Sequence, residues 1–288
     1  MISSDFRCLS CGSTRAAEFL LQCKDYYMGK AGSFDYYRCE TCGLVQLHPV
    51  PADMAPYYEM YQVHKPKSRF HELFRKWLMR RVYYNPSTLD RGLRILDFGC
   101  GDGWYLREMA REGHQATGFE PNPRHANWLT QSLGIPVFSE IERIESEKKE
   151  GFDLVTMHFV VEHLHNLRET FLLACRLLKP GGRFYFIIPN IESIEARVFK
   201  RKWHGFDPPR HILFPTPSVI EKIAEEIGFD IQRKVVFGSP NDLAGTLSTV
   251  FFGRFHYLAF CGFLPLALLW CVIGAQGNVA VTLVKKGA

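Results

Sequence analysis

The sequence has little of several features that would assign it to large classes of proteins. Its first residues contain no apolar core of a secretory signal, so we expect its nine cysteines to lie in a reducing cytoplasm without disulfides. Its net charge of +5 over 288 residues is small. Such a charge argues against a general nucleic-acid binder with a dense basic face, although it permits an anionic substrate or a membrane surface.

Four of the cysteines form two closely spaced pairs, each followed by a glycine. The pairs are Cys8-Leu9-Ser10-Cys11-Gly12 and Cys39-Glu40-Thr41-Cys42-Gly43. Two such turns place four thiolates around one tetrahedral ion, and we expect zinc there rather than free or redox thiols. Because four cysteines leave no position for a water, this zinc would be structural. It would hold residues 1–50 together as a zinc-binding module with a small sheet around Tyr36 to Arg38.

Residues 51–92 are predicted to contain a linker and one helix. Prolines at 49, 51 and 56 end regular structure at the start of this stretch. Apolar residues recur at helical spacing within residues 70–81, with basic residues around them. This basic amphipathic helix either packs on the rest of the chain or lies on an anionic membrane.

Strand-like and helix-like segments alternate in residues 93–288, which indicates an α/β fold with a parallel sheet covered on both faces. The predicted strands are residues 95–98, 116–119, 137–138, 153–157, 183–188, 231–237 and 279–284. The predicted helices are residues 104–112, 124–133, 167–178 and 217–227. The third helix is expected to stop at Pro180-Gly181-Gly182 before the next strand begins.

The most informative stretch is the one in which the first of these strands turns into a helix. It reads Asp97-Phe98-Gly99-Cys100-Gly101-Asp102-Gly103. Glycines let a backbone pass close to a ligand, and the exposed amides of a helix start favour electron-rich groups. Glu120 ends the next strand about 20 residues later, where a carboxylate can bind a ribose diol. A dinucleotide site needs a further glycine where Trp104 stands, and Asp97 suits a cationic amino-acid tail, so a pyrophosphate is disfavoured.

These residues resemble the first two motifs of class I S-adenosylmethionine-dependent methyltransferases. The resemblance implies a Rossmann-like seven-stranded sheet whose last two strands form an antiparallel hairpin. It also implies the residues that contact S-adenosylmethionine: Asp97, Gly99 and Gly101 at its amino-acid end, Glu120 at its ribose, His158 in the pocket wall and Glu140 near its adenine.

Two loops carry histidines at positions where a catalytic base would lie. His163 belongs to a Glu-His-Leu sequence that methyltransferases of this family often carry beside the methyl group. His211 ends Asp207-Pro208-Pro209-Arg210-His211, which the prolines are expected to hold extended so that Arg210 and His211 are presented. The segment resembles one in bacterial methyltransferases of surface-polysaccharide clusters. In zinc-headed sugar C-methyltransferases, a histidine of the corresponding segment is the proposed base.

A base is needed because an alcohol or a carbon acid must lose a proton when it is methylated, and a histidine near neutral pKa suits this task. We therefore rank His211 first and His163 second as catalytic residues. The alternative is that one or both only hold their loops by hydrogen bonds.

Residues 241–277 lie between the last two predicted strands and include part of a stretch, from 257 to 284, with no charged residue. Residues 258–275 have the length of a membrane span. However, the two flanking strands belong to one sheet, so the segment must return to the side that it left. We predict an apolar helical insertion, kinked or turned at Pro265, that enters a membrane interface, covers the substrate pocket or contacts a partner subunit.

The sequence thus predicts a methyltransferase with an N-terminal zinc-binding module. It would act on carbon or oxygen of a small polar metabolite, a sugar or a lipid-linked intermediate. We expect it in the cytoplasm, either free or peripheral at the inner face of the membrane, and its oligomeric state stays open. The chain lacks the Asn/Asp-Pro-Pro-aromatic tetrad of nucleic-acid N-methyltransferases, which argues against a nucleobase acceptor. Two alternatives remain: an RNA methyltransferase that binds RNA through its zinc module, and a non-catalytic binding protein on the same scaffold.

Overall fold

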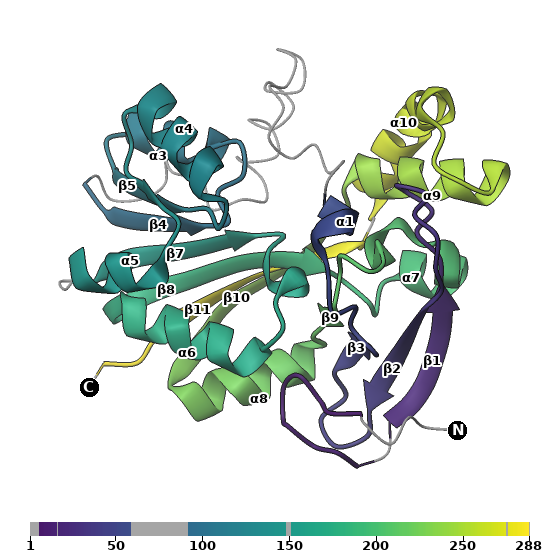
Figure 1. Ribbon diagram of the computed structural model, residues 1–288, viewed down its shortest axis with the longest axis horizontal. Helices are drawn as coiled ribbons and strands as arrows, with labels where there is room; N and C mark the ends of the chain where they lie inside the picture. The colour runs from purple at the N-terminus through teal and green to yellow at the C-terminus, as the bar shows by residue number, and fades with distance from the viewer. Residues whose placement is uncertain (1–5, 16, 59–91, 148–150, 275, 288) are drawn as a thin grey trace.

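A mostly parallel seven-stranded sheet forms the centre of the molecule (Figure 1). The computed structural model describes residues 6–15, 17–58, 92–147, 151–274 and 276–287. The sheet has the order β10-β11-β8-β7-β4-β5-β6. Its strands are β4 (Arg94–Phe98), β5 (Gln115–Phe119), β6 (Val137–Phe138), β7 (Phe152–His158), β8 (Leu178–Pro189), β10 (Phe229–Phe237) and β11 (Asn278–Lys285). Strands β10 and β11 pair antiparallel, which confirms the predicted Rossmann-like sheet and its final hairpin.

Helices cover both faces of this sheet (Figure 1). They are α3 (Trp104–Arg111) and α4 (Pro123–Leu133) on one face, with α5 (Ile141–Glu147), α6 (Leu167–Leu177) and α8 (Pro217–Ile227) on the other. Strand β4 shows the cause, because its successive side chains point to opposite faces. Ile95 is buried in the core that contains Leu106 of α3, whereas Leu96 is buried in the core that contains Phe171 of α6.

Strand β8 begins at Leu178, whereas the sequence predicted a strand from residue 183. The helix does end at this point, since α6 stops at Leu177. The proline and glycines that follow do not end the sheet ladder, because Leu178 already pairs with Phe152 of β7. The side-chain amine of Lys285 also donates to the carbonyl oxygen of Leu178 (2.7 Å). Pro180, Gly181 and Gly182 therefore follow the end of α6 as predicted, but they lie inside β8 instead of before it.

The N-terminal module forms a second, antiparallel sheet with the order β1-β2-β3-β9. Its strands are β1 (Ala17–Cys23), β2 (Phe34–Cys39), β3 (Val45–Leu47) and β9 (Leu213–Phe214). Strand β9 follows His211 in the sequence and lies between β8 and β10, two strands of the larger sheet. The C-terminal part of the chain therefore contributes one strand to the N-terminal sheet. The division into residues 1–50, 51–92 and 93–288 stays a prediction. Helix α1 (Ala55–Tyr58) lies in the predicted linker, and the basic helix predicted at residues 70–81 lies outside the described residues.

The remaining helices include the predicted apolar insertion. They are α7 (Ile194–Phe199), α9 (Pro240–Phe252) and α10 (Tyr257–Ile273), with the short 3-10 turns η2 (Val161–His163), η3 (Lys200–Lys202) and η4 (His204–Phe206). Helices α9 and α10 connect β10 to β11 and pack side by side (Figure 1). Pro265 lies inside α10 without ending it. Among the described helices, none has both the length and the apolar character that a membrane crossing requires.

Candidate active site and metal site

The turn after β4 requires glycine at several positions. Gly99, Gly101 and Gly103 have positive φ angles of 71°, 55° and 69°, which side chains disfavour. A Cβ atom at Gly99 would lie 2.6 Å from Cγ2 of Val160, so a larger residue would clash there. The turn is thus packed directly against the loop that follows β7, which also contains Phe159 in the left-handed region at φ 56°.

Two predicted cofactor carboxylates lie at the ends of neighbouring parallel strands. Asp97 is buried at the end of β4, where its Oδ1 accepts a hydrogen bond from Thr156 Oγ1 (2.7 Å) and lies 3.2 Å from His158 Nδ1. Glu120 follows β5, and its Oε1 accepts from the amide of Asn122 (3.2 Å). The carboxyl ends of parallel strands form the ligand-binding edge of such sheets. Both carboxylates are therefore fixed at the edge where a nucleoside would bind.

The sixth predicted cofactor residue, Glu140, is exposed and follows β6 at the same edge. Two further residues near this edge were not predicted from the sequence. Gly118 lies where a Cβ atom would be 2.7 Å from Cδ1 of Leu106, and His125 places its Nε2 2.7 Å from the carbonyl oxygen of Gly101. A glycine inside a strand is a signal of close approach and could have identified Gly118. The position of His125 depends on how α4 packs, which no local pattern gives.

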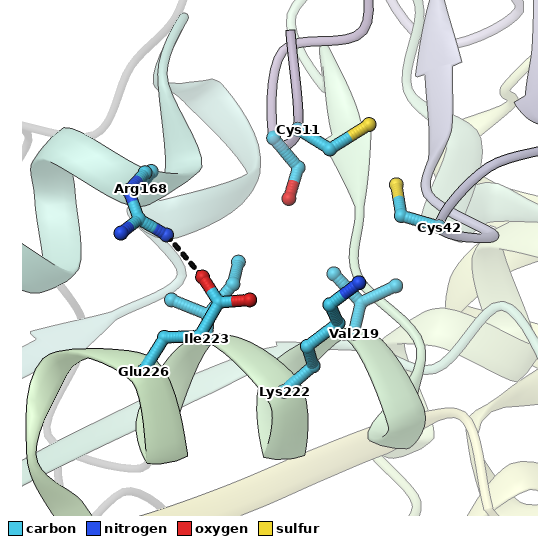
Figure 2. A pocket seen from close by; sticks show the side chains of 8 residues that line it. Cys11, Cys42, Arg168, Val219, Lys222, Ile223 and Glu226 are labelled. Carbon is cyan, nitrogen blue, oxygen red and sulfur yellow. Dashed lines mark hydrogen bonds and ion pairs between the residues drawn. The ribbon is translucent and has the colours of Figure 1, made fainter. Parts of the chain in front are cut away.

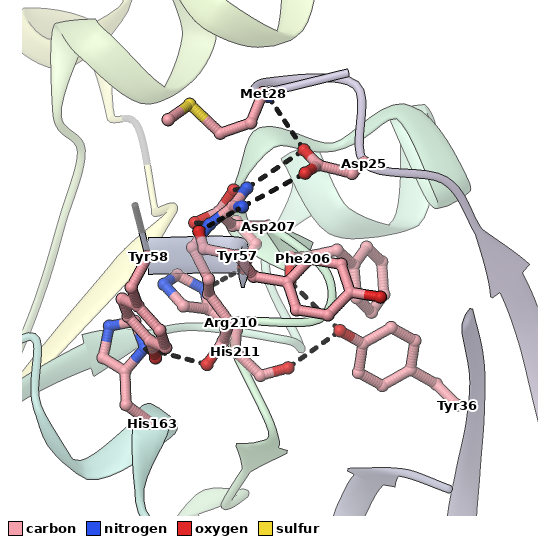
Figure 3. A network of polar contacts seen from close by, with 11 residues as sticks. Asp25, Met28, Tyr36, Tyr57, Tyr58, His163, Phe206, Asp207, Arg210 and His211 are labelled. Carbon is pink, nitrogen blue, oxygen red and sulfur yellow. Dashed lines mark hydrogen bonds and ion pairs between the residues drawn. The ribbon is translucent and has the colours of Figure 1, made fainter. Parts of the chain in front are cut away.

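His163 and His211 lie against each other, with ring centroids 4.7 Å apart and an interplanar angle of 75° (Figure 3). Nδ1 of His163 is 2.8 Å from the carbonyl oxygen of Arg210, and Nδ1 of His211 is 2.7 Å from that of Gly205. Because a carbonyl oxygen only accepts, each Nδ1 carries the proton and each Nε2 is left as the basic nitrogen. Burial lowers the pKa of both imidazoles, that of His163 to about 3. The pair therefore consists of two neutral bases at neutral pH.

Glu162 adds a buried acid to this pair. Its side chain is fully buried, and neither carboxyl oxygen has a hydrogen-bond partner among the described residues. Burial raises its pKa to about 8, so it is mostly protonated at neutral pH. Ligand atoms of Glu162, His163 and His211 lie within 4.8 Å of one another. In the sequence, Glu162 stands out only as the first residue of the Glu-His-Leu motif, whereas in the structure the three groups form one site that can accept or hold a proton.

Arg210 was expected to be presented with His211 on an extended segment, and this prediction is wrong. The segment turns at Asp207, and Arg210 is fully buried. Figure 3 shows its contacts with Asp25 and Asp207. Its guanidinium donates to both carboxyl oxygens of Asp25, at 3.1 and 3.0 Å, and to Asp207 at 2.9 Å. A buried guanidinium requires such partners, and this requirement outweighs the extended preference of the prolines. Arg210 therefore links the N-terminal module to the loop that carries His211.

The four cysteines of the predicted zinc site meet in the structure. Sγ of Cys8 lies 3.5 Å from that of Cys42, Sγ of Cys11 lies 3.8 Å from that of Cys39, and all four sulfurs lie within 4.8 Å of one another. A tetrahedral zinc ion with sulfurs about 2.3 Å away holds its ligands about 3.8 Å apart, so the cluster fits zinc. The hydrogen bond from Cys8 lowers the pKa of the Cys42 thiol to about 5, which favours a thiolate.

A pocket of about 300 Å³ separates these cysteines from the helices α6 and α8 (Figure 2). Cys11 and Cys42 face it from one side, and Lys222 and the ion-paired Arg168 and Glu226 face it from the other. The amide of Leu167, at the start of α6, donates to the carbonyl oxygen of Leu9 between the first two cysteines (3.1 Å). The turn between the first two cysteines thus contacts the start of α6, and the cluster lies across a pocket from α6 and α8. This place among the outer helices fits a structural ion.

A family model described as a methyltransferase domain matches residues 68–234, more than half of the chain. The chain belongs to this methyltransferase family. Its central sheet is the fold of class I S-adenosylmethionine-dependent methyltransferases. It resembles the crystal structure of an S-adenosylmethionine-dependent methyltransferase from Archaeoglobus fulgidus, with a TM-score of 0.53 and 21% identity over 80% of this chain and 99% of that one.

Curated relatives of this methyltransferase are ubiquinone biosynthesis O-methyltransferases. That of Methylobacterium sp. (strain 4-46) is 37% identical over 33% of this chain and 40% of the relative. That of Rhizobium rhizogenes is 32% identical over 52% of this chain and 65% of the relative. The mitochondrial one of Rattus norvegicus is 27% identical over 60% of this chain and 52% of the relative. The chain thus spans 40 to 65% of the length of these three relatives.

Proposed function

We propose that this methyltransferase transfers the methyl group of S-adenosylmethionine to oxygen or carbon of a small polar metabolite, a sugar or a lipid-linked intermediate. The observation that carries this proposal is the pair of neutral histidines on loops that meet beside the glycine turn. The names of the curated relatives favour an oxygen acceptor over carbon. A hydroxyl acceptor has a proton to lose, and a neutral imidazole can take it.

The residues of the strand edge suit the cofactor. S-adenosylmethionine, when bound, supplies an electrophilic methyl group on a sulfonium. Asp97 would hold its amino-acid end and Glu120 its ribose diol. Because Gly99 and Gly101 have no side chains, the backbone of the turn can lie close to the ligand. The buried setting of Asp97 keeps water from competing for this carboxylate.

His211 would act as the general base in this reaction, with His163 as the second candidate. The proton of the acceptor hydroxyl would move to Nε2 of His211 while the new carbon–oxygen bond forms and the carbon–sulfur bond breaks. The carbonyl oxygen of Gly205 would hold the imidazole by its Nδ1 proton and keep the basic nitrogen directed at the acceptor. The enzyme otherwise contributes mainly by aligning donor and acceptor.

Cys8, Cys11, Cys39 and Cys42 would hold a structural zinc ion. This ion would keep the N-terminal sheet folded, and through Asp25 and Arg210 that sheet supports the loop of His211. The module would therefore serve as the platform on which the acceptor side of the site is built.

The proposal is tested by cofactor binding followed by group transfer. Calorimetry of the purified chain with S-adenosylmethionine should show binding at micromolar concentrations, and Asp97→Ala should weaken it. Incubation with methyl-labelled S-adenosylmethionine and separate lipid, polar-metabolite and RNA extracts should then label a lipid or a polar metabolite. Label in the RNA extract alone would overturn the acceptor class, and absence of cofactor binding would favour a non-catalytic scaffold.

A further inference from the structure

Helix α10 exposes much of its apolar surface. Ala267 is the one buried residue among its 17 residues, none of which is charged. Leu258 is 74% exposed, Val272 78% and Ile273 65%, although all three are large and apolar. Monomeric soluble proteins rarely expose a contiguous apolar area of this kind without using it.

The exposed side chains cover about half of the circumference of α10. At about 100° per residue, Leu258, Leu266 and Val272 spread over about 120°. The exposed Leu269 and Ile273 lie within this arc, and Leu268 and Tyr257 extend it to about 180°. The opposite half of the helix packs against α9 through Phe260, Phe263 and Leu264 around Ala267. A partner helix would cover only a narrow stripe of α10, narrower than this exposed arc. Lipid can cover the whole apolar arc of a helix that lies in a membrane interface.

The same apolar surface continues onto α9 and α7. Phe251, near the end of α9, is 67% exposed and stacks on Phe263 of α10 with ring centroids 5.4 Å apart. A groove of about 270 Å³ lies between α7, α9 and α10. The exposed apolar residues of α7 and α10 that line it are Ile194, Val198, Leu266, Leu269 and Ile273. We call the exposed apolar residues of α7, α9 and α10 the apolar face.

Basic residues belong to the same helix, α7, and to the turns that adjoin α7 and α9. They are Arg197 of α7, the run Lys200-Arg201-Lys202 of η3, and Arg254 in the turn between α9 and α10. The amine of Lys202 donates to the carbonyl oxygen of Val250 (3.3 Å), which fixes η3 against α9. The groove also has one carboxylate in its lining, that of Glu195, which is buried. Its Oε1 accepts hydrogen bonds from Trp270 Nε1 (2.8 Å) and from the amide of Gln276 (3.1 Å). We call these five residues the basic rim.

We propose that the apolar face inserts into the interface of an anionic membrane while the basic rim contacts the lipid headgroups. Helix α10 is about 25 Å long, which suits an element lying within one leaflet better than one crossing both. An apolar surface with adjacent Lys and Arg is the pattern of peripheral membrane anchors. The amide of His204, in the segment that leads to His211, donates to Thr246 Oγ1 of α9 (2.9 Å). Docking therefore holds the histidine loops close to the lipid surface.

Flotation of the full-length chain with lipid vesicles tests this proposal. The chain should float with vesicles of phosphatidylcholine and phosphatidylglycerol, and at least tenfold less with phosphatidylcholine alone, because each basic residue near the surface adds to anionic binding. Val272→Glu and the double variant Lys200→Glu with Arg201→Glu should each lower the bound fraction at least tenfold. Val236→Glu, on the exposed side of β10, is the matched control and should float like the parent chain.

Binding of S-adenosylmethionine and the melting temperature should stay unchanged in Val272→Glu, which separates this proposal from that of methyl transfer. Two outcomes would overturn it. One is a parent chain that floats with neither vesicle. The other is a parent chain that light scattering shows to be a dimer and that Val272→Glu converts to a monomer, since the apolar face would then be an interface between two copies.

Discussion

At the scale of the residue, His211 is prepared as a base by its surroundings rather than by a charged partner. Its Nδ1 proton is held by the carbonyl oxygen of Gly205, and burial lowers its pKa. We expect His211→Ala to reduce kcat by about 10²- to 10⁴-fold, the usual contribution of a general base. His163→Ala should have a smaller effect, and the exposed His165→Ala serves as the control. Near-normal turnover of His211→Ala with intact cofactor binding would remove His211 from the mechanism.

The lowered pKa values of the two histidines also predict a pH profile. Because each imidazole stays neutral until the pH falls below its lowered pKa, the acidic limb of kcat/KM should lie below pH 6.5, the ordinary value for histidine. Steady-state rates between pH 4 and pH 8, at a saturating cofactor concentration, would locate this limb. A limb at or above pH 6.5 would mean that the base is an exposed group instead.

Glu162 couples the stability of the fold to pH. Its carboxyl releases a proton near 4.5 in the unfolded chain and only near 8 in the folded one. The folded state therefore holds one more proton between these values, so this group makes the free energy of unfolding fall as pH rises from 4.5 to 8. Glu162→Gln should remove this slope. The free energy of unfolding of Glu162→Gln minus that of the parent chain should be on the order of 4 kcal/mol larger at pH 8.5 than at pH 4.

Urea unfolding of the parent chain and of Glu162→Gln at both pH values measures this difference. Taking the difference between the two proteins cancels the titration of the histidines, which acts in the opposite direction. Parallel pH dependences in the two proteins would show that the folded chain does not raise the pKa of Glu162.

At the scale of the element, Arg210 joins three segments that are distant in the sequence. It pairs with Asp207 of its own loop and with Asp25 between β1 and β2, and it donates to the carbonyl oxygen of Tyr57 in α1 (3.4 Å). Arg210→Met would leave two buried carboxylates without their cation and should destabilise the fold by about 3–5 kcal/mol. Arg168→Met, which removes a partly exposed ion pair with Glu226, should cost less than about 1 kcal/mol. Equal losses in chemical denaturation would contradict this account.

Elements defined by local patterns were predicted well, whereas elements that depend on distant partners were not. The seven strands of the large sheet and the helices α3, α4, α6 and α8 follow from the alternation of strand-like and helix-like segments and from the stop signal at Pro180-Gly181-Gly182. Strand β9 has two residues and exists because Leu213 and Phe214 pair with β3. Two residues carry too little pattern to predict such a pairing, since the partner strand lies about 168 positions away.

The candidate site shows the same division. The glycine turn and the acid after the next strand were predicted because both lie within one βαβ unit, close together in the sequence. The burial of Arg210 was missed because its partner Asp25 lies in another part of the chain. The neutral state of Glu162 was missed because it results from packing on all sides.

At the scale of the whole molecule, the cysteine cluster and the histidine loops belong to one folded unit. Removing the proposed zinc ion with a chelator, or changing Cys39 to Ser, should unfold the N-terminal sheet and with it weaken the support of β9. We expect methyl transfer to fall together with protection of β1 and β2 from protease, while Cys175→Ser behaves like the parent chain. Zinc analysis of the purified protein that finds no metal would contradict this prediction.

The pairing of β3 with β9 also sets an order of events during synthesis. A ribosome adds roughly 5–20 residues each second, so strand β9 leaves it on the order of 10–30 s after β3. Throughout that interval the edge of β3 that does not pair with β2 has no partner strand from its own chain. A nascent N-terminal module would thus expose an open sheet edge until Phe214 had left the ribosome, which is the period when chaperone binding would protect it most.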